Sequence, residues 1–106
     1  MGVWVAQQWS VREEDKAACL LALQAIADHI RAEHPEILGV RTEVQWVGSQ
    51  AHRGIAWAEH YESLTAVESG AATQTCSDVW APVYAMTLAG THTRSVWLDS
   101  EPTWAH

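Results

Sequence analysis

Hydrophobic and polar residues follow two different periods in the first third of the chain. Residues 3–9 are rich in Val and Trp and contain no breaker, which is typical of a β-strand. Apolar residues then recur at helical spacing up to about residue 34, on one face formed by Cys19, Leu20, Leu23, Ile26, Ala27 and Ile30. Ser10 followed by Glu13 predicts a capping box at the start of this helix, and Pro35 ends it. The pattern predicts a one-sided helix that lies on a sheet.

The middle of the chain predicts a hairpin with a defined register. Residues 37–47 and 52–61 are expected to be strands joined by a turn at 48–51. If Val47 faces His52, one face carries Val40, Thr42, Val44, Trp46, Ile55 and Trp57. The other face then carries Arg41, Glu43, Gln45, His52, Gly54, Ala56, Ala58 and His60. One face is bulky and apolar and the other is polar or small, so a slip by one residue would mix them.

The remaining segments complete a known order of elements. Residues 63–75 are expected to form a second helix, and Ser77 or Asp78 is expected to cap a short helix that carries Trp80. Residues 91–99 are expected to form the last strand. The order strand, helix, strand, strand, helix, strand predicts an α+β, ferredoxin-like βαββαβ fold. We expect one domain over residues 1–106, with a four-stranded antiparallel sheet and helices on one face.

The second face of such a sheet has no helix to cover it, and two interpretations stay open. A second copy of the chain is the simplest cover, since two-fold dimers are the commonest oligomers. Trp4 or Trp9, Val47 and Trp97 are the candidates for that contact. The alternative is a monomer with a solvated face, which antiparallel sheets allow.

Charge and composition narrow the partners. The 106-residue chain has a net charge of -7 and a single lysine, so nucleic acid and anionic membrane surfaces are unexpected partners. The longest apolar run, residues 17–23, is too short to span a bilayer. The first residues lack the pattern of a signal peptide, so we expect a cytoplasmic protein. The chain is also rich in tryptophan, with seven Trp and no Phe.

Motifs for bound groups are missing from the sequence. The six His and two Cys do not form metal-ligand spacings, and Cys19 and Cys76 suggest no disulfide framework. No phosphate-binding glycine loop, dinucleotide fingerprint or nucleophile elbow is present. We therefore expect neither a metal nor a cofactor.

Two stretches resemble a known superfamily. Pro35-Glu36-Ile37-Leu38-Gly39-Val40 is similar to a Pro-Gly-x-x-Gly entry into the second strand, with Glu36 where Gly is usual. Trp57-Ala58-Glu59-His60-Tyr61-Glu62-Ser63-Leu64-Thr65-Ala66 is similar to the exit of the third strand. That exit has an acid, an aromatic residue and then Glu-Ser at the second helix. The chain resembles the dimeric α/β-barrel superfamily, most of all its antibiotic-biosynthesis-monooxygenase-like branch. This resemblance implies a barrel built from two sheets and a homodimer through the sheet face.

The resemblance also implies a pocket between the sheet and the helices. The register places Trp46 and Trp57 on the helix side, and Trp80 and Tyr84 belong to the short helix that would close over them. These four residues are the candidates for substrate binding, because clefts lined by aromatic rings are typical small-molecule sites. The alternative is that the rings fill a core that has no Phe.

His60 and Arg41 are the candidates for chemistry. A His beside a carboxylate can act as acid or base near neutral pH, and an Arg can stabilise an anion. The plainer interpretation is a half-solvated His at a strand end and an ordinary salt-bridged Arg.

The function implied by the resemblance is oxidation of a small aromatic or polyketide-like substrate by O₂ without metal or flavin. Superfamily members that degrade haem use an Asn, which this chain lacks, so that activity is not carried over. The alternative function is a non-catalytic dimeric protein that binds a small ligand or regulates a pathway.

Overall fold

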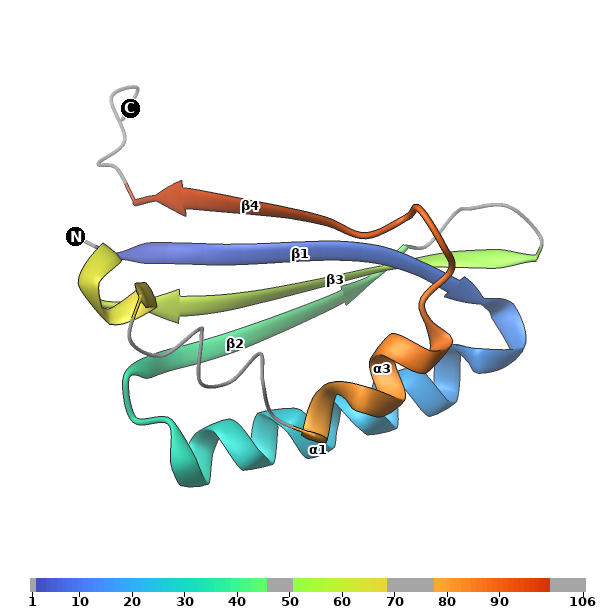
Figure 1. Cartoon of the computed structure of the whole chain (residues 1–106), viewed down its shortest axis with the longest axis horizontal. Coiled ribbons are helices and arrows are strands. Elements are labelled where there is room, and N and C mark those ends of the chain that lie inside the picture. The colour runs from blue at the N-terminus through green and yellow to red at the C-terminus, as the bar shows by residue number, and fades with distance from the viewer. Residues whose placement is uncertain (1, 46–50, 69–77, 100–106) are drawn as a thin grey trace, which may run out of the picture.

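The computed structural model describes residues 2–45, 51–68 and 78–99, which form one sheet with helices on one face (Figure 1). The elements are β1 (Val3–Arg12), α1 (Lys16–Glu33), β2 (Ile37–Val44), β3 (His52–Tyr61), α3 (Ala81–Met86) and β4 (Thr93–Leu98). Single 3₁₀ turns at Glu13–Asp15 and Asp78–Trp80 precede the two helices, and residues 64–68 are also helical. The strand order is β2-β3-β1-β4 with every neighbouring pair antiparallel, so the predicted ferredoxin-like fold is confirmed.

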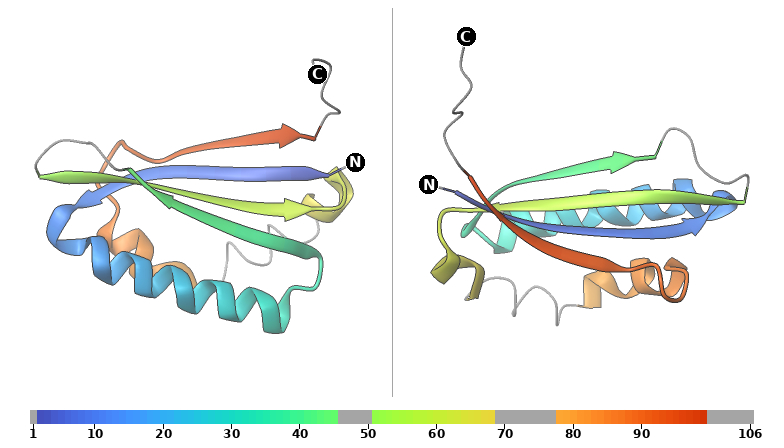
Figure 2. Two further views of the ribbon diagram at one scale, coloured as in Figure 1. Left: turned by 180° about the vertical axis from the view of Figure 1, so that it is seen from behind. Right: turned by 90° about the horizontal axis from the view of Figure 1, so that it is seen from above.

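The helices share one side of the sheet. Both views of Figure 2 show α1 and α3 on the same face of the four strands. The two central strands, β3 and β1, present alternating buried residues to these helices. None of the helices in the described parts of the chain has the length and apolarity needed to cross a membrane.

The predicted register of the middle hairpin is confirmed. Thr42 pairs with Trp57 and Val44 with Ile55, which is the same offset that pairs Val47 with His52. A bulge between Ile37 and Gly39 shifts the register only at the start of β2. Trp46 and Val47 themselves lie outside the described residues.

The predicted capping box is wrong because β1 is longer than expected. Ser10 pairs with Gly54, and its backbone N–H donates a hydrogen bond to Thr91 Oγ1 at 3.1 Å. Val11 is fully buried, which a helix start at Ser10 would prevent. The ladder bonds and this apolar burial outweigh the one or two hydrogen bonds of a cap. The α-helix therefore starts at Lys16, without a side-chain cap.

The core lies between the sheet and α1, where the predicted helical stripe is confirmed. Cys19, Leu23, Ile26 and Ile30 are buried on α1. Beneath them lie the buried residues of the two central strands, Val3, Val5, Trp9, Val11, Ile55, Trp57 and Tyr61. Trp9 is thus a core residue, which leaves Trp4 as the candidate for the uncovered face.

Replacing Ile26 tests the assignment of the buried helix face. Ile26→Ala should lower the free energy of unfolding by about 2–5 kcal/mol, because it deletes buried methyl groups and leaves a cavity. Leu21→Ala is the matched control on the same helix, since Leu21 is 74% exposed and Ile26 0%. The control should change stability by less than about 0.5 kcal/mol in denaturant unfolding. Equal effects of the two changes would contradict the assignment.

Candidate functional site

The helix-facing side of β3 combines two aromatic rings with a buried acid. Trp57, Glu59 and Tyr61 occupy alternate positions, so all three point toward the helix layer. Glu59 is only 1% exposed, while Trp57 and Tyr61 are 2% and 0% exposed. A buried carboxylate is costly unless it is hydrogen-bonded or paired. Its presence in the middle of an apolar core therefore marks a position that packing alone does not explain.

Hydrogen bonds from both neighbouring rings orient the Glu59 carboxylate. Trp57 Nε1 donates to Glu59 Oε2 at 3.0 Å, and the Tyr61 hydroxyl donates to Glu59 Oε1 at 3.0 Å. Each oxygen thus accepts from a different ring, which offsets part of the desolvation cost. The same bonds fix the plane of the Trp57 indole and the direction of the Tyr61 hydroxyl.

The environment of Tyr61 keeps its phenol protonated. Burial raises the pKa of Tyr61 most, and the negative charge of Glu59 and the hydrogen bond to it raise it further. Arg94 acts in the opposite direction on the same pKa. Tyr61 is therefore a neutral hydrogen-bond donor at physiological pH.

A chain of aromatic contacts leads from Trp57 to the surface. The rings of Trp57 and Trp80 meet edge to face with centroids 5.5 Å apart and an interplanar angle of 88°. Trp80 stacks on Tyr84, with centroids 6.1 Å apart and an angle of 22°. Trp80 is 2% exposed and Tyr84 49%. The Nε1 atom of Trp80 is buried and has no hydrogen-bond partner in the described parts of the structure. An unpaired buried donor of this kind is unusual in a protein core.

A cleft of about 400 Å³ lies between α1 and β2 and reaches Trp57. Its apolar lining includes Leu23, Ala27, Val40 and Trp57, and Arg31 and Thr42 are among its polar residues. Small-molecule sites are commonly apolar clefts of about 300–1,000 Å³ with a few polar groups. The cleft thus has the size and the lining for a small, largely apolar ligand.

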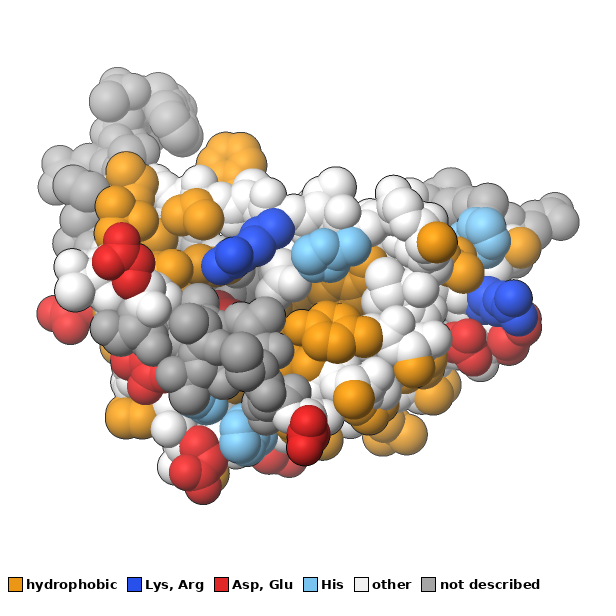
Figure 3. All heavy atoms as spheres, viewed as in Figure 1, with side chains coloured by type: hydrophobic (Ala, Val, Ile, Leu, Met, Phe, Trp, Pro, Cys, Tyr) orange, Lys and Arg blue, Asp and Glu red, His pale blue; other side chains and the backbone are white. Residues whose placement is uncertain are grey.

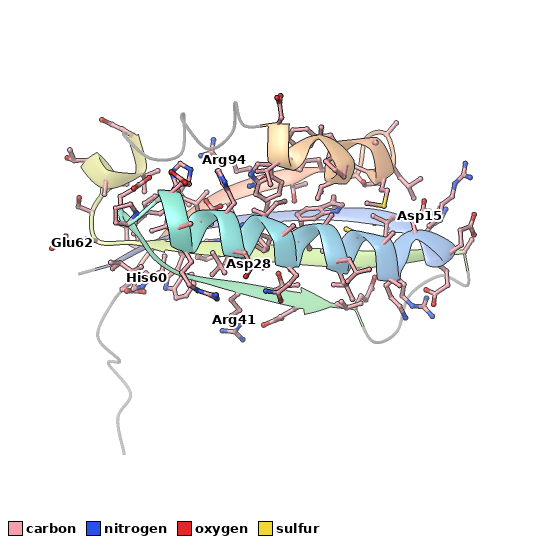
Figure 4. The ribbon with its side chains drawn as sticks, turned by 90° about the horizontal axis from the view of Figure 1, so that it is seen from below. Asp15, Asp28, Arg41, His60, Glu62 and Arg94 are labelled. Atoms are coloured by element: carbon pink, nitrogen blue, oxygen red, sulfur yellow. The ribbon has the colours of Figure 1, made fainter. Side chains whose placement is uncertain are left out.

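Arg94 supplies a positive charge on the helix side of the sheet. It pairs with Gln7 in the β1–β4 ladder. Gln7 lies on the same face of β1 as the buried Val5 and Trp9. Figure 4 shows Arg94 on the side of α1 that faces α3. Its positive charge lowers the pKa of Tyr61, against the larger effects of burial and Glu59.

His60 and its neighbours lie on the opposite face of the sheet. The His60 ring stacks on Trp4, with centroids 4.5 Å apart and an interplanar angle of 15°. His60 Nε2 is 3.2 Å from Asp99 Oδ2. Gly2 runs close to this pair, and a Cβ atom there would clash with His60 Nε2 and Asp99 Oδ2. A larger residue at position 2 would displace the His60–Asp99 contact.

The uncovered face also has a depression of about 380 Å³. Ala6, Ala56 and Ala58 form its lining together with the larger side chains of Trp4 and Trp97. Arg41 is at this depression as well and pairs with Glu43, N to O 2.6 Å, with both side chains exposed. Figure 4 places Arg41 and His60 on the side of α1 away from Arg94.

The sheet therefore separates the residues predicted to form one site. Trp57, Trp80 and Tyr84 come together on the helix side, and His60 and Arg41 lie on the other face. Trp46 lies outside the described residues.

Sequence reasoning missed the polar residues of the helix side, namely Glu59, Tyr61 and Arg94. A signal for Glu59 was present. The predicted register places it on the apolar face with Ile55 and Trp57, where an acid is unexpected. The sequence offers no such signal for Arg94, because a charged residue is ordinary on a strand that is exposed along its whole length.

No metal centre forms among the described residues, where three or more His, Cys, Asp or Glu side chains nowhere gather in a way that could hold an ion.

Solved structures share this fold. SnoaB, a cofactor-independent oxygenase from Streptomyces nogalater, superposes with a TM-score of 0.73 at 10% sequence identity, over 98% of this chain and 98% of that one. A dimeric protein of unknown function and ferredoxin-like fold from Bacteroides fragilis gives 0.70 at 11%, over 91% and 94%. An antibiotic biosynthesis monooxygenase gives 0.61 at 15%, over 96% and 100%. No protein-family model and no curated protein matches the sequence. The resemblance to the antibiotic-biosynthesis-monooxygenase-like branch is thus confirmed in the fold, which is all that such identities show.

The raised pKa of Tyr61 predicts a loss of stability at high pH. The folded state holds the phenolic proton more tightly than the unfolded state, so this contribution is complete below the ordinary tyrosine pKa of about 10 and is lost as pH rises above it. Denaturant unfolding from neutral to alkaline pH should show a steeper decline above that value in the wild type than in Tyr61→Phe. Tyr84→Phe is the matched control and should keep the steep decline. Identical slopes in the two variants would contradict the assignment.

Proposed function

We propose that the protein binds a small aromatic or polyketide-like molecule on the helix side of its sheet and promotes its oxidation by O₂ without metal or flavin. The observation that carries this proposal is the fixed Trp57 ring. Its Nε1 is held by a buried carboxylate, and the residue lines a cleft of about 400 Å³. The fold shared with the cofactor-independent oxygenase SnoaB supports the reaction class only by analogy.

For this reaction the protein must orient the substrate ring and stabilise the substrate anion. A phenol that loses its proton can give electrons to O₂, and oxidation of a phenol to a quinone by one O₂ releases one water. Trp57 would pack against the ring in the cleft, where Thr42 is a polar neighbour. Arg31 lines the same cleft and would supply positive charge for the developing anion, and preorganised charge of this kind is a large catalytic term. Glu59 acts through Trp57 and Tyr61 as a positioning residue.

His60 and Arg41 do not take part in the proposed reaction on the helix side. They lie across the sheet from the rings, so a single substrate molecule on the helix side of one chain does not reach them. They remain candidates for chemistry only at a site on the uncovered face, closed by a second copy.

A second function is favoured by that same separation. If no acid or base reaches the rings, the protein is a binding or regulatory module for a small apolar ligand. Binding of the ligand would then quench the Trp fluorescence without forming a product.

Oxygen uptake with a panel of hydroxylated aromatics separates the two functions. We expect uptake that requires substrate, and Trp57→Phe should weaken ligand-induced quenching of the fluorescence. Glu59→Gln and His60→Gln form a matched pair, because these neighbours on β3 point to opposite faces. Misplacing the ring should make Glu59→Gln the more damaging change, up to about a hundredfold in turnover.

Two other outcomes of this experiment would contradict the proposal. A larger loss in His60→Gln would move the chemistry to the uncovered face and refute the helix-side site. Quenching without oxygen uptake across the whole panel would refute the oxygenase and leave the binding module.

We also propose that the uncovered face joins a second copy of the chain. Trp97 is 63% exposed on this face and pairs with Trp4 in the β1–β4 ladder. Figure 3 shows hydrophobic side chains near the end of β4 in the view of Figure 1, and the register places Val96 and Leu98 of this strand on the helix side. The uncovered face carries a depression beside Trp97 and both signs of charge, which suit a self-complementary two-fold contact. The dimeric Bacteroides fragilis protein of the same fold supports this assembly.

A charge on this face should prevent the association. Trp97→Asp would bury an unpaired carboxylate in the contact, which is strongly unfavourable. Sedimentation should show a dimer for the wild type and a monomer for Trp97→Asp. Leu21→Asp is the control, because Leu21 is 74% exposed on α1 at the other face of the sheet. A monomeric wild type, or a dimeric Trp97→Asp, would refute the proposed interface.

A further inference from the structure

Trp and Tyr are among the side chains most readily oxidised by one electron. Three of them form a continuous path on the helix side of this sheet. Trp57 contacts Trp80 at 5.5 Å between centroids, and Trp80 contacts Tyr84 at 6.1 Å. Both ring pairs are near enough for direct contact. The path begins at a 2% exposed ring and ends at one that is 49% exposed. Only the outer end of the path is therefore in contact with solvent and open to solutes.

The inner end of the path is arranged to favour loss of an electron. Glu59 Oε2 accepts the hydrogen bond of Trp57 Nε1 at 3.0 Å inside the core. A carboxylate at this distance stabilises positive charge on the indole, and burial strengthens that effect because little water screens it. Trp57 is thus the member of the path at which an oxidising equivalent is most readily received from a ligand in the neighbouring cleft.

We propose that Trp57, Trp80 and Tyr84 form an electron relay that removes oxidising equivalents from the ligand cleft and delivers them to the surface. A one-electron oxidant takes an electron from Trp57 and leaves an indole radical cation. Trp80 returns an electron to Trp57, and Tyr84 returns one to Trp80. Tyr84 then releases its phenolic proton to water and becomes a neutral phenoxyl radical. A soluble reductant such as a thiol or ascorbate restores Tyr84 with one electron, and the proton comes back from water.

The use of the relay rests on the proposed oxygen chemistry, but the path itself does not. In that chemistry the oxidant would be a substrate-derived radical or a reduced oxygen species that fails to react productively. The relay would then protect the fixed Trp57 ring from irreversible oxidation. The path can be tested without substrate, so its failure and that of the oxygenase proposal are distinguishable.

The test uses a photogenerated one-electron oxidant, ruthenium tris(bipyridine) with persulfate, on the full chain with and without ascorbate. Peptide mapping by mass spectrometry then measures oxidised products at each ring. Tyr84→Phe is the decisive variant, because Phe keeps the ring in place and is far harder to oxidise. We expect the oxidised fraction of Trp57 and Trp80 to rise in Tyr84→Phe, and ascorbate to protect these rings more strongly in the wild type than in Tyr84→Phe.

Two further variants test the middle ring of the path and an aromatic ring outside it. Trp80→Phe removes the middle ring, so the oxidised fraction of Trp57 should rise while Tyr84 is still attacked directly from solution. Trp97→Phe, which changes an exposed ring on the other face, should leave the Trp57 yield as in the wild type. Unchanged yields at Trp57 in Tyr84→Phe would overturn the relay. So would an equal rise of the Trp57 yield in Trp97→Phe.

Discussion

Burial of one face of β3 is the constraint on which the rest of this structure depends. β3 lies between β1 and β2, so its helix-facing residues, Ile55, Trp57, Glu59 and Tyr61, are removed from water on all sides. Two-residue alternation then forces Ala56, Ala58 and His60 to the other face. One strand thereby creates a packed aromatic side under α1 and a hollowed, partly charged side without cover.

The predictable part of the fold is the part where burial and periodicity agree. The stripe of α1 and the register of the hairpin followed from spacing alone, because any other arrangement exposes several large apolar side chains. The start of α1 did not follow. Ser10 and Glu13 satisfy a local rule, but the pairing of Ser10 with Gly54 and the burial of Val11 depend on strands distant in sequence. Such tertiary contacts decide element ends more often than element existence.

The candidate site could be predicted only in its apolar half. Aromatic residues on a buried face can be read from alternation, and Trp57 and Trp80 do meet there. The polar half depends on distances between strands that alternation does not give. The Tyr61 hydroxyl and Trp57 Nε1 reach the same carboxylate only because three residues alternate on one strand, while Arg94 arrives from β4 through its pairing with Gln7.

The two faces of the sheet set different requirements. This difference helps to explain why the chain uses Trp and Tyr but no Phe. The helix side must hold a charge in an apolar core, and it does so with donors from Trp57 and Tyr61, which Phe could not provide. The preference for Trp and Tyr over Phe is therefore chemical as well as steric at these positions. On the other face, small residues leave a depression beside Trp97. The proposed ligand site and the proposed partner surface thus lie on the two faces of one alternating strand.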